Sequence, residues 1–339
     1  MSSGRSSGVE HNLAKVGVEG SNPFARSIFP FEIYIWVTIA SAIDAACRGL
    51  QTIGRMSKTA AQLLMERETR VRYGPVAPDV FGHIIEPGHG QVETDSYLLR
   101  TPDGLSYFYR KGDGITICRD AAADASEEHL WLNGTVYAAV ACINGLLPIH
   151  ASAVAYKGKI FAFTGPTGAG KSTLIAALGQ LGLPMYCDDT LVLDLSDPDR
   201  IVCLPGHKRL KLTPEALELT GAKRAEKVGR EIDKYYAQAP GGDVATPMPL
   251  AELLFLEVGP AMAIARLSGS ERFIRTEDDH YTAWLFAAAR QFDRAAQFAH
   301  RARLARQIGM ARFIRPWDST LFHESVALAA QHVTSGVHN

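Results

Sequence analysis

The sequence lacks the cysteine and histidine patterns of disulfide frameworks and structural metal sites. Its five cysteines are odd in number, and no two of them have the C-x-x-C spacing of zinc sites and redox motifs. The eleven histidines are scattered and form no H-E-x-x-H motif. We therefore expect reduced thiols that pack as small apolar side chains, and a cytoplasmic protein.

An excess of positive charge and a long uninterrupted apolar run are also missing. The 35 Lys and Arg residues against 36 Asp and Glu residues leave a formal net charge of -1, which argues against a nucleic-acid partner. The most apolar segment, 28–46, contains Pro30, Glu32 and Asp44. Its unbroken apolar part is shorter than the roughly 20 residues of a membrane-spanning helix. We therefore expect no membrane partner.

Residues 1–65 are expected to be a disordered or mis-assigned N-terminal extension. Residues 1–26 are rich in Ser, Gly and Asn and show no hydrophobic periodicity, which is typical of segments that cannot bury a core. The run 9–15 looks like a frame-translated transfer-RNA gene. We therefore expect that the start codon has been assigned too far upstream, with Met56 or Met65 as the true start.

Residues 66–146 are predicted to form a small β-rich region that ends in a helix. Aromatic and β-branched runs at 96–100, 106–110 and 114–118 are separated by turns rich in Gly and Asp, which predicts a small antiparallel sheet. The segment 124–145 begins with a capping box and ends at a glycine, as helices commonly do.

Residues 147–270 have the mixed strand and helix pattern of an α/β domain. Two apolar strands, 152–156 and 159–164, are joined by Lys157-Gly158, a pair that favours a tight hairpin. The charged segment 208–242 is expected to be partly helical and to cover the functional site as a flap.

Residues 271–339 are predicted to be largely helical, with an interruption at Arg315-Pro316-Trp317, because proline cannot continue a helix. The predicted fold class is therefore α/β. It consists of a P-loop core, a small β-rich N-terminal region and C-terminal helices.

The segment GPTGAGKS, Gly165 to Ser172, matches the P-loop motif G-x-x-x-x-G-K-[ST]. An apolar strand precedes it and an apolar helix follows it, which is the context that the motif requires. Glycines let successive main-chain N–H groups point into one concavity that binds phosphate. Lys171 is expected to contact the β- and γ-phosphates of ATP, the Ser172 hydroxyl to ligate Mg²⁺, and Thr173 to approach the α-phosphate. The predicted nucleotide-binding residues are Gly165, Pro166, Thr167, Gly168, Ala169, Gly170, Lys171, Ser172 and Thr173.

Asp188 and Asp189 follow an apolar run that begins one helix after the P-loop. We expect this run to form a strand beside the P-loop strand and to deliver both carboxylates to the phosphates. One carboxylate would hold Mg²⁺, and the other would accept the proton of an attacking hydroxyl. Two like charges this close also raise one pKa, which suits a general base.

The runs 147–154 (LPIHASAV), 165–172 (GPTGAGKS) and 186–192 (YCDDTLV) together resemble the C-terminal catalytic domain of HPr serine kinase/phosphorylases. They are closer still to the HPr-kinase-like proteins of lasso-peptide biosynthesis clusters, which phosphorylate a serine of the precursor peptide. The resemblance implies the phosphoenolpyruvate-carboxykinase-like α/β fold, ATP and Mg²⁺ as ligands, and a serine-containing peptide or small protein as acceptor. It also implies that the chain can form a homo-oligomer.

The resemblance also implies roles for single residues. Asp188 would be the general base, Asp189 would act at the metal together with Ser172, and His150 would tune the charge of the Asp pair. The sequence departs from HPr kinases because no Glu-Ile-Arg-Gly segment follows the Asp pair. A reverse phosphorylase activity and HPr as the acceptor therefore stay open, and Arg209 or Lys211 is a candidate for a phosphate contact.

Three functions are compatible with these motifs. The first is an ATP-dependent serine kinase that acts on a peptide or small protein. The second is a small-metabolite kinase that shares the P-loop. The third is an ATP-gated binding protein without transfer chemistry. The resemblance favours the first.

Overall fold

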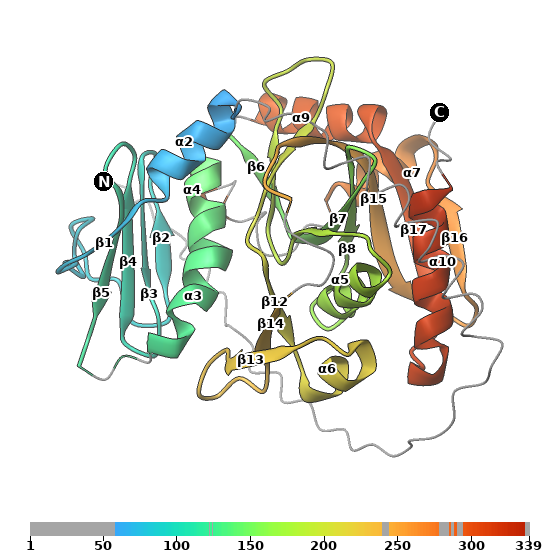
Figure 1. Cartoon of the computed structure of the whole chain (residues 1–339). Coiled ribbons are helices and arrows are strands. Elements are labelled where there is room, and N and C mark those ends of the chain that lie inside the picture. Colours follow the sequence, from blue (N-terminus) through green and yellow to red (C-terminus); the bar gives the residue numbers. More distant parts are fainter. Residues whose placement is uncertain are drawn as a thin grey trace, which may run out of the picture.

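The computed structural model describes residues 58–121, 123, 125–238, 244–277, 285, 288–289 and 294–335. The apolar segment 28–46 and most of the predicted N-terminal extension lie outside these residues. The described chain is a mixed α/β structure with three β-sheets (Figure 1). Within the described ranges we find no helix with both the length and the apolar character that crossing a bilayer requires.

The first sheet has five strands in the order β1-β5-β4-β3-β2, in which only the β1–β5 pair is parallel. The three strands predicted in this region are confirmed as β3, β4 and β5, whereas β1 and β2 were not predicted. Tyr97, Tyr107 and Tyr109 are fully buried on this sheet, as expected for aromatic side chains on a pleated, half-covered surface. The strands are β1 (Val71–Tyr73), β2 (Gly90–Val92), β3 (Ser96–Arg100), β4 (Leu105–Arg110) and β5 (Gly114–Arg119).

The helix predicted after this sheet is present but is not regular. It consists of a 3₁₀ turn η2 (Ala125–Glu127), α3 (Glu128–Trp131), a π-helical turn η3 (Leu132–Val136) and α4 (Tyr137–Ile143). Together with α2 (Ala60–Glu68), it lies between the five-stranded sheet and the rest of the molecule (Figure 1). The side chains of α4 therefore pack in one core with residues of the five-stranded sheet and with Val192 and Leu204 of the second, larger sheet.

The second sheet has nine strands, seven of them in the order β6-β10-β11-β15-β8-β7-β9. The predicted hairpin at Lys157-Gly158 is confirmed, because β7 and β8 pair up to Tyr156 and Lys159. Both turn residues have positive φ, 46° and 73°, as a two-residue type I′ turn requires. The strands are β6 (Leu147–Ile149), β7 (Ala151–Tyr156), β8 (Lys159–Thr164), β9 (Met185–Cys187), β10 (Leu191–Asp194), β11 (Val202–Leu204), β15 (Met248–Val258), β16 (Ala263–Arg266) and β17 (Gly309–Arg315).

Two predictions about this sheet are wrong. Strand β9, which precedes the Asp pair, does not lie beside the P-loop strand β8, because β7 and β15 occupy both sides of β8. The run 309–315 is a strand and not a helix. It pairs in parallel with β15 over seven residues, and this long-range pairing overrides the helical pattern of the flanking sequence.

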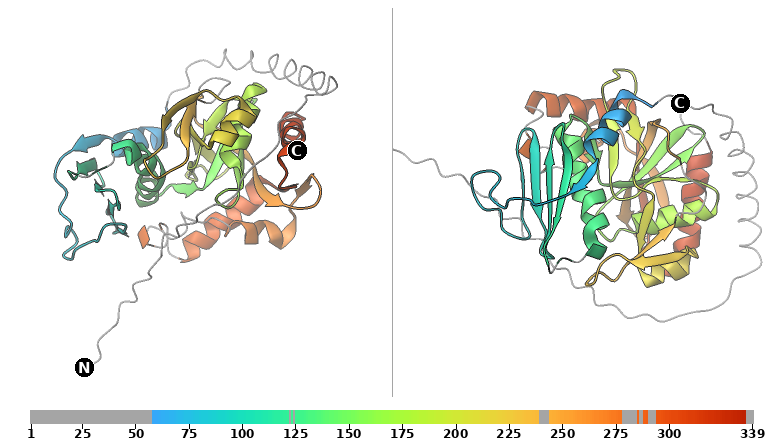
Figure 2. Two further views of the ribbon diagram at one scale, coloured as in Figure 1. Left: turned by 90° about the horizontal axis from the view of Figure 1, so that it is seen from below. Right: turned by 60° about the vertical axis from the view of Figure 1, so that its left-hand side comes forward.

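Helices cover both faces of the large sheet (Figures 1 and 2). Because successive strand residues point to opposite faces, Phe161 and Phe163 pack in one core with α5 and α10, whereas Ile160 and Ala162 pack in another with α9. The helices are α5 (Lys171–Gln180), α7 (Gly269–Arg275), α9 (Arg294–Gln307), η4 (Ser319–Leu321) and α10 (Phe322–Thr334).

The predicted flap is a third sheet with one short helix. Strands β12 (Arg209–Leu212), β14 (Tyr235–Gln238) and β13 (Arg224–Lys227) pair in that order. The helical part is α6 (Pro214–Thr220), which Thr213 caps by accepting a hydrogen bond from the main-chain N–H of Ala216. Its strands were not predicted, because their partners are separated by helix α6 and by charged loops.

Candidate active site

The loop between β8 and α5 contains the predicted phosphate-binding residues 165–173. A Cβ atom at Gly165 would lie 3.1 Å from the main-chain oxygen of Leu256, which is tighter than most Cβ contacts in proteins. Gly170, the N-cap of α5, has a φ of 79° in the left-handed region that side chains disfavour. These glycines give a tight loop at a helix N-terminus, where main-chain N–H groups and the helix dipole attract anions.

Lys171 is buried at the first position of α5 and lies against the loop itself. Its ammonium group donates hydrogen bonds to the main-chain oxygens of Gly165, at 2.8 Å, and Pro166, at 3.2 Å. The ammonium charge is therefore held inside the concavity that the loop encloses.

Asp188, just after β9, is buried next to the start of α5. Its Oδ1 accepts hydrogen bonds from the hydroxyls of Ser152, at 2.6 Å, and Ser172, at 2.8 Å. Its buried Oδ2 has no hydrogen-bond partner. Burial raises the pKa of Asp188, and the neighbouring charge of Asp189 adds to this effect, although Lys211 opposes it.

Ser172 and Asp189 are the residues predicted to hold the metal ion. In the structure, the Ser172 hydroxyl donates its hydrogen bond to Asp188. Among the described residues, no three His, Cys, Asp or Glu side chains gather as a metal site. The oxygen atoms available to a cation at the P-loop are therefore few, and they include an orphaned carboxylate oxygen.

Asp189 faces different partners from its neighbour. Its Oδ2 is 2.8 Å from the ammonium group of Lys211, and its Oδ1 is 3.5 Å from Nδ1 of His150. Burial alone would raise the pKa of Asp189, but Lys211 and His150 outweigh it and lower the pKa. The two adjacent carboxylates thus have pKa values shifted in opposite directions, which is a common feature of acid–base sites.

His150 contacts Asp189, as the sequence predicted. Burial lowers the pKa of His150 to about 4, although the charge of Asp189 acts in the opposite direction. The imidazole is therefore neutral near pH 7. Its Nδ1 is 3.0 Å from the main-chain oxygen of Asp189, so we assign the proton to Nδ1, which donates to that oxygen.

Two elements from other parts of the fold, β12 and the π-helical turn η3, place residues against Asp189. Lys211 comes from β12 of the small sheet, and burial lowers its pKa less than Asp189 and Asp188 raise it. Gly134 comes from the π-helical turn η3, where a Cβ atom would lie 3.3 Å from Oδ2 of Asp189. Lys211 was considered from the sequence, but Gly134 was not, because no local motif marks a π-helical turn.

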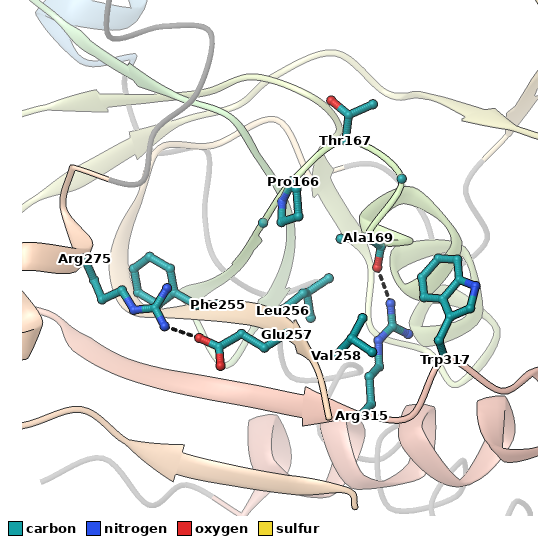
Figure 3. Close-up of a pocket in the computed structure, with 12 residues that line it drawn as sticks. Pro166, Thr167, Ala169, Phe255, Leu256, Glu257, Val258, Arg275, Arg315 and Trp317 are labelled. Atoms are coloured by element: carbon teal, nitrogen blue, oxygen red, sulfur yellow. Dashed lines mark hydrogen bonds and ion pairs between the residues drawn. The ribbon is translucent and has the colours of Figure 1, made fainter. Parts of the chain in front are cut away.

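Two cavities meet at the P-loop. One has a volume of about 830 Å³ and extends from His150 and Asp189 past Lys171 and Thr173 to the start of α10. The other has a volume of about 660 Å³ and lies between residues 165–169, the end of β15 and the end of β17 (Figure 3). The predicted P-loop residues, His150 and Asp189 therefore line space large enough for a nucleotide and an acceptor, whereas Asp188 lines neither cavity.

Arg315 and Trp317 line both cavities, and sequence reasoning did not assign either of them to the site. The guanidinium group of Arg315 donates a hydrogen bond to the main-chain oxygen of Ala169 in the P-loop (Figure 3). The available signal was the Arg-Pro-Trp interruption, which was interpreted only as a break between helices.

Comparisons with known proteins give little beyond this geometry. No family model matches the chain, and no curated protein is similar enough to count as a relative. One similar solved structure is the HPr(Ser) kinase/phosphatase from Coxiella burnetii. Its TM-score is 0.29 and its identity 11%, over 56% of this chain and 97% of that chain. Because these values are low, we draw no functional conclusion from this likeness.

Proposed function

We propose that this protein is an HPr-kinase-like serine kinase that transfers the γ-phosphate of Mg-ATP to a hydroxyl of a peptide or small protein. The observation that carries the proposal is the contact between Ser172, at the start of the P-loop helix, and the buried Asp188. This contact brings a phosphate-binding loop and a carboxylate with a raised pKa into one site. We also propose that the large sheet is the phosphoenolpyruvate-carboxykinase-like core.

The P-loop would hold the triphosphate. Main-chain N–H groups of residues 165–170 and the N-terminus of α5 bind phosphate oxygens. Lys171 now donates to two neutral carbonyl oxygens. Phosphate oxygens are charged acceptors and form stronger hydrogen bonds, so we expect the ammonium group to transfer to them when the nucleotide binds.

The oxygen groups around Ser172 fit a magnesium ion. Mg²⁺ is bound in kinases by one or two carboxylates together with substrate phosphates and water, so a full protein-only cage is not needed. The Ser172 hydroxyl and the carboxylate of Asp189, which line the same cavity as Lys171, would provide such oxygens, whereas the buried Asp188 is assigned to proton transfer. Bound Mg²⁺ would neutralise charge on the β- and γ-phosphates.

Asp188 would accept the proton of the attacking hydroxyl. The hydroxyl oxygen forms a bond to the γ-phosphorus, the bond from that phosphorus to the β–γ bridging oxygen breaks, and ADP leaves. The raised pKa of Asp188 makes it a better proton acceptor than an exposed aspartate. Lys211 keeps Asp189 ionised, and the neutral His150 holds its main chain in place beside Asp188.

A transfer assay with γ-labelled ATP tests this proposal. We expect label on serine-containing peptides or small proteins, and we expect Lys171→Ala to remove the transfer, because the phosphates lose their main positive contact. The matched control is Lys159→Ala, which removes an exposed lysine from the same strand–loop–helix unit. Label on sugars or nucleosides instead would assign the site to a metabolite kinase. ATP binding without any labelled acceptor would favour a binding protein.

A further inference from the structure

Arg315 is a buried cation at the phosphate loop. Its relative exposure is 9%, and its guanidinium group donates a hydrogen bond to the neutral main-chain oxygen of Ala169. No carboxylate of the described chain pairs with it. Burying a charge without a counter-charge is costly, so this arginine is retained next to the P-loop at the expense of stability.

The loop is shaped to admit this guanidinium group. A Cβ atom at Gly170 would lie 2.8 Å from Nη2 of Arg315, so any other residue at the start of α5 would push the arginine away. Two other arginines nearby already have a carboxylate partner, because Arg275 and Arg312 both form ion pairs with Glu257. Arg315, three residues beyond Arg312 on the same strand, has no carboxylate partner in the described chain and is thus available for an anion.

Trp317 lies two residues further along the chain, at the border of both cavities (Figure 3). Its relative exposure is 69%. This is unusual, because tryptophan side chains are on average largely buried. The larger cavity, of about 830 Å³, is also lined by Thr173 of the P-loop helix. A flat, exposed aromatic ring beside a phosphate site matches the face of a nucleobase.

We propose that residues 315–317 form a nucleotide clamp, in which Arg315 binds a phosphate group of the nucleotide and Trp317 packs against its base. This inference rests on the proposed function, because it assumes that the P-loop binds a nucleoside triphosphate. The proline between the two residues restricts the backbone and holds both side chains at the end of β17.

Binding measured by calorimetry on the full chain separates the two halves of the clamp. The probes are Mg-ATP and Mg-tripolyphosphate, which has the phosphates but no base. We expect Arg315→Gln to weaken binding of both probes by about 10- to 100-fold, the range for a lost hydrogen bond to a charged group. We expect Trp317→Ala to weaken only Mg-ATP, by roughly 10-fold, and Trp317→Phe to restore most of the affinity.

Arg312→Gln is the matched control, because it removes an arginine from the same strand that already pairs with Glu257. We expect it to leave the affinity for both probes unchanged. Thermal unfolding without ligand shows whether each variant is folded, and Arg315→Lys, which keeps the charge, replaces Arg315→Gln if the latter does not fold.

Unchanged affinity of the folded Arg315 variant would overturn the clamp and leave the proposed function intact. The same holds if Trp317→Ala weakens tripolyphosphate as much as ATP, because the indole would then not act on the base. If the wild-type protein bound neither probe, the proposed function would fail first and the clamp with it.

Discussion

Charged side chains are buried in two regions of this molecule, and the two regions treat them differently. Beside the five-stranded sheet, Glu68 at the end of α2 accepts hydrogen bonds from the Tyr109 hydroxyl, the main-chain N–H of Gly112 and Arg67. At the P-loop, Asp188 has an oxygen without a partner, and Arg315 has no carboxylate in the described chain. Incomplete pairing, rather than burial itself, therefore distinguishes the candidate active site.

The pKa values follow the same division. Burial acts to raise the pKa of Glu68, but its hydrogen bonds outweigh burial and lower the pKa. Glu128, which is bound by Arg119 and Tyr73, behaves in the same way. At the P-loop, burial prevails for Asp188 and raises its pKa. A fully paired carboxylate stabilises the fold, whereas a partly paired one stays reactive.

The largest expected effect comes from Asp188→Asn. We expect phosphoryl transfer to fall by roughly 100- to 10,000-fold, the usual contribution of a general base, while Mg-ATP binding changes little. Glu128→Gln, in the other region, should leave the rate per folded molecule unchanged. Labelled-ATP assays and calorimetry measure both quantities. Loss of Mg²⁺-dependent ATP binding in the Asp188 variant would instead assign this carboxylate to the cation.

A smaller effect, on stability and not on the rate of phosphoryl transfer, is expected for Glu68→Gln. The substitution removes a charge that three donors share, so we expect the free energy of unfolding to fall by about 2 kcal/mol. Urea unfolding followed by circular dichroism measures this value. Glu66→Gln is the control on the same helix, because the Glu66 ion pair with Lys58 is exposed and such pairs contribute little. Equal losses in both variants would show that the pairing of Glu68 is not special.

The smallest effect concerns stability at the Asp pair itself. The folded-state pKa of Asp188 is raised, so ionisation of Asp188 destabilises the fold at neutral pH. Below the ordinary pKa of 3.8 the carboxyl group is protonated in both the folded and the unfolded state, and this destabilisation is absent. We therefore expect Asp188→Asn to raise the free energy of unfolding at pH 7 by about 1 kcal/mol, and this gain to shrink as the pH falls.

Asp189 should show the reverse sign. Its folded-state pKa is lowered, so its ionised form stabilises the fold above the ordinary value of 3.8, and this contribution is lost as the pH falls through the lowered pKa. Asp189→Asn should therefore destabilise the protein at pH 7. Unfolding curves for both variants at several pH values test the pair, and shifts of the same sign would contradict the opposed pKa values.

The parts of the fold that sequence reasoning predicted depend on local interactions. The P-loop needs glycines at fixed positions, and the hairpin at Lys157-Gly158 needs positive φ at two consecutive residues. Both requirements are visible in a few residues. Strands β3, β4 and β5 were predictable for the same reason, because short turns join them.

The parts that were missed depend on distant residues. Strand β17 forms against β15, where Glu252 pairs with Gly309 and Val258 with Arg315, and Arg315 reaches the P-loop only through this long-range pairing. Lys211 meets Asp189 because the small sheet folds over the site. Asp188 was expected to differ from Asp189 in role. Which of the two carboxylates the Ser172 hydroxyl contacts could not be predicted, since two adjacent aspartates look alike until their partners are known.

The π-helical turn at Leu132–Val136 has a consequence for how the molecule can be divided. Its Gly134 lies against Asp189, and the helix that follows shares one core with Val192 and Leu204 of the large sheet. A shortened chain that begins at residue 147 would lose the surface that shields this aspartate and would expose two apolar strands to water. The β-rich region thus covers part of the candidate active site, and we expect it to unfold together with the large sheet in a single transition.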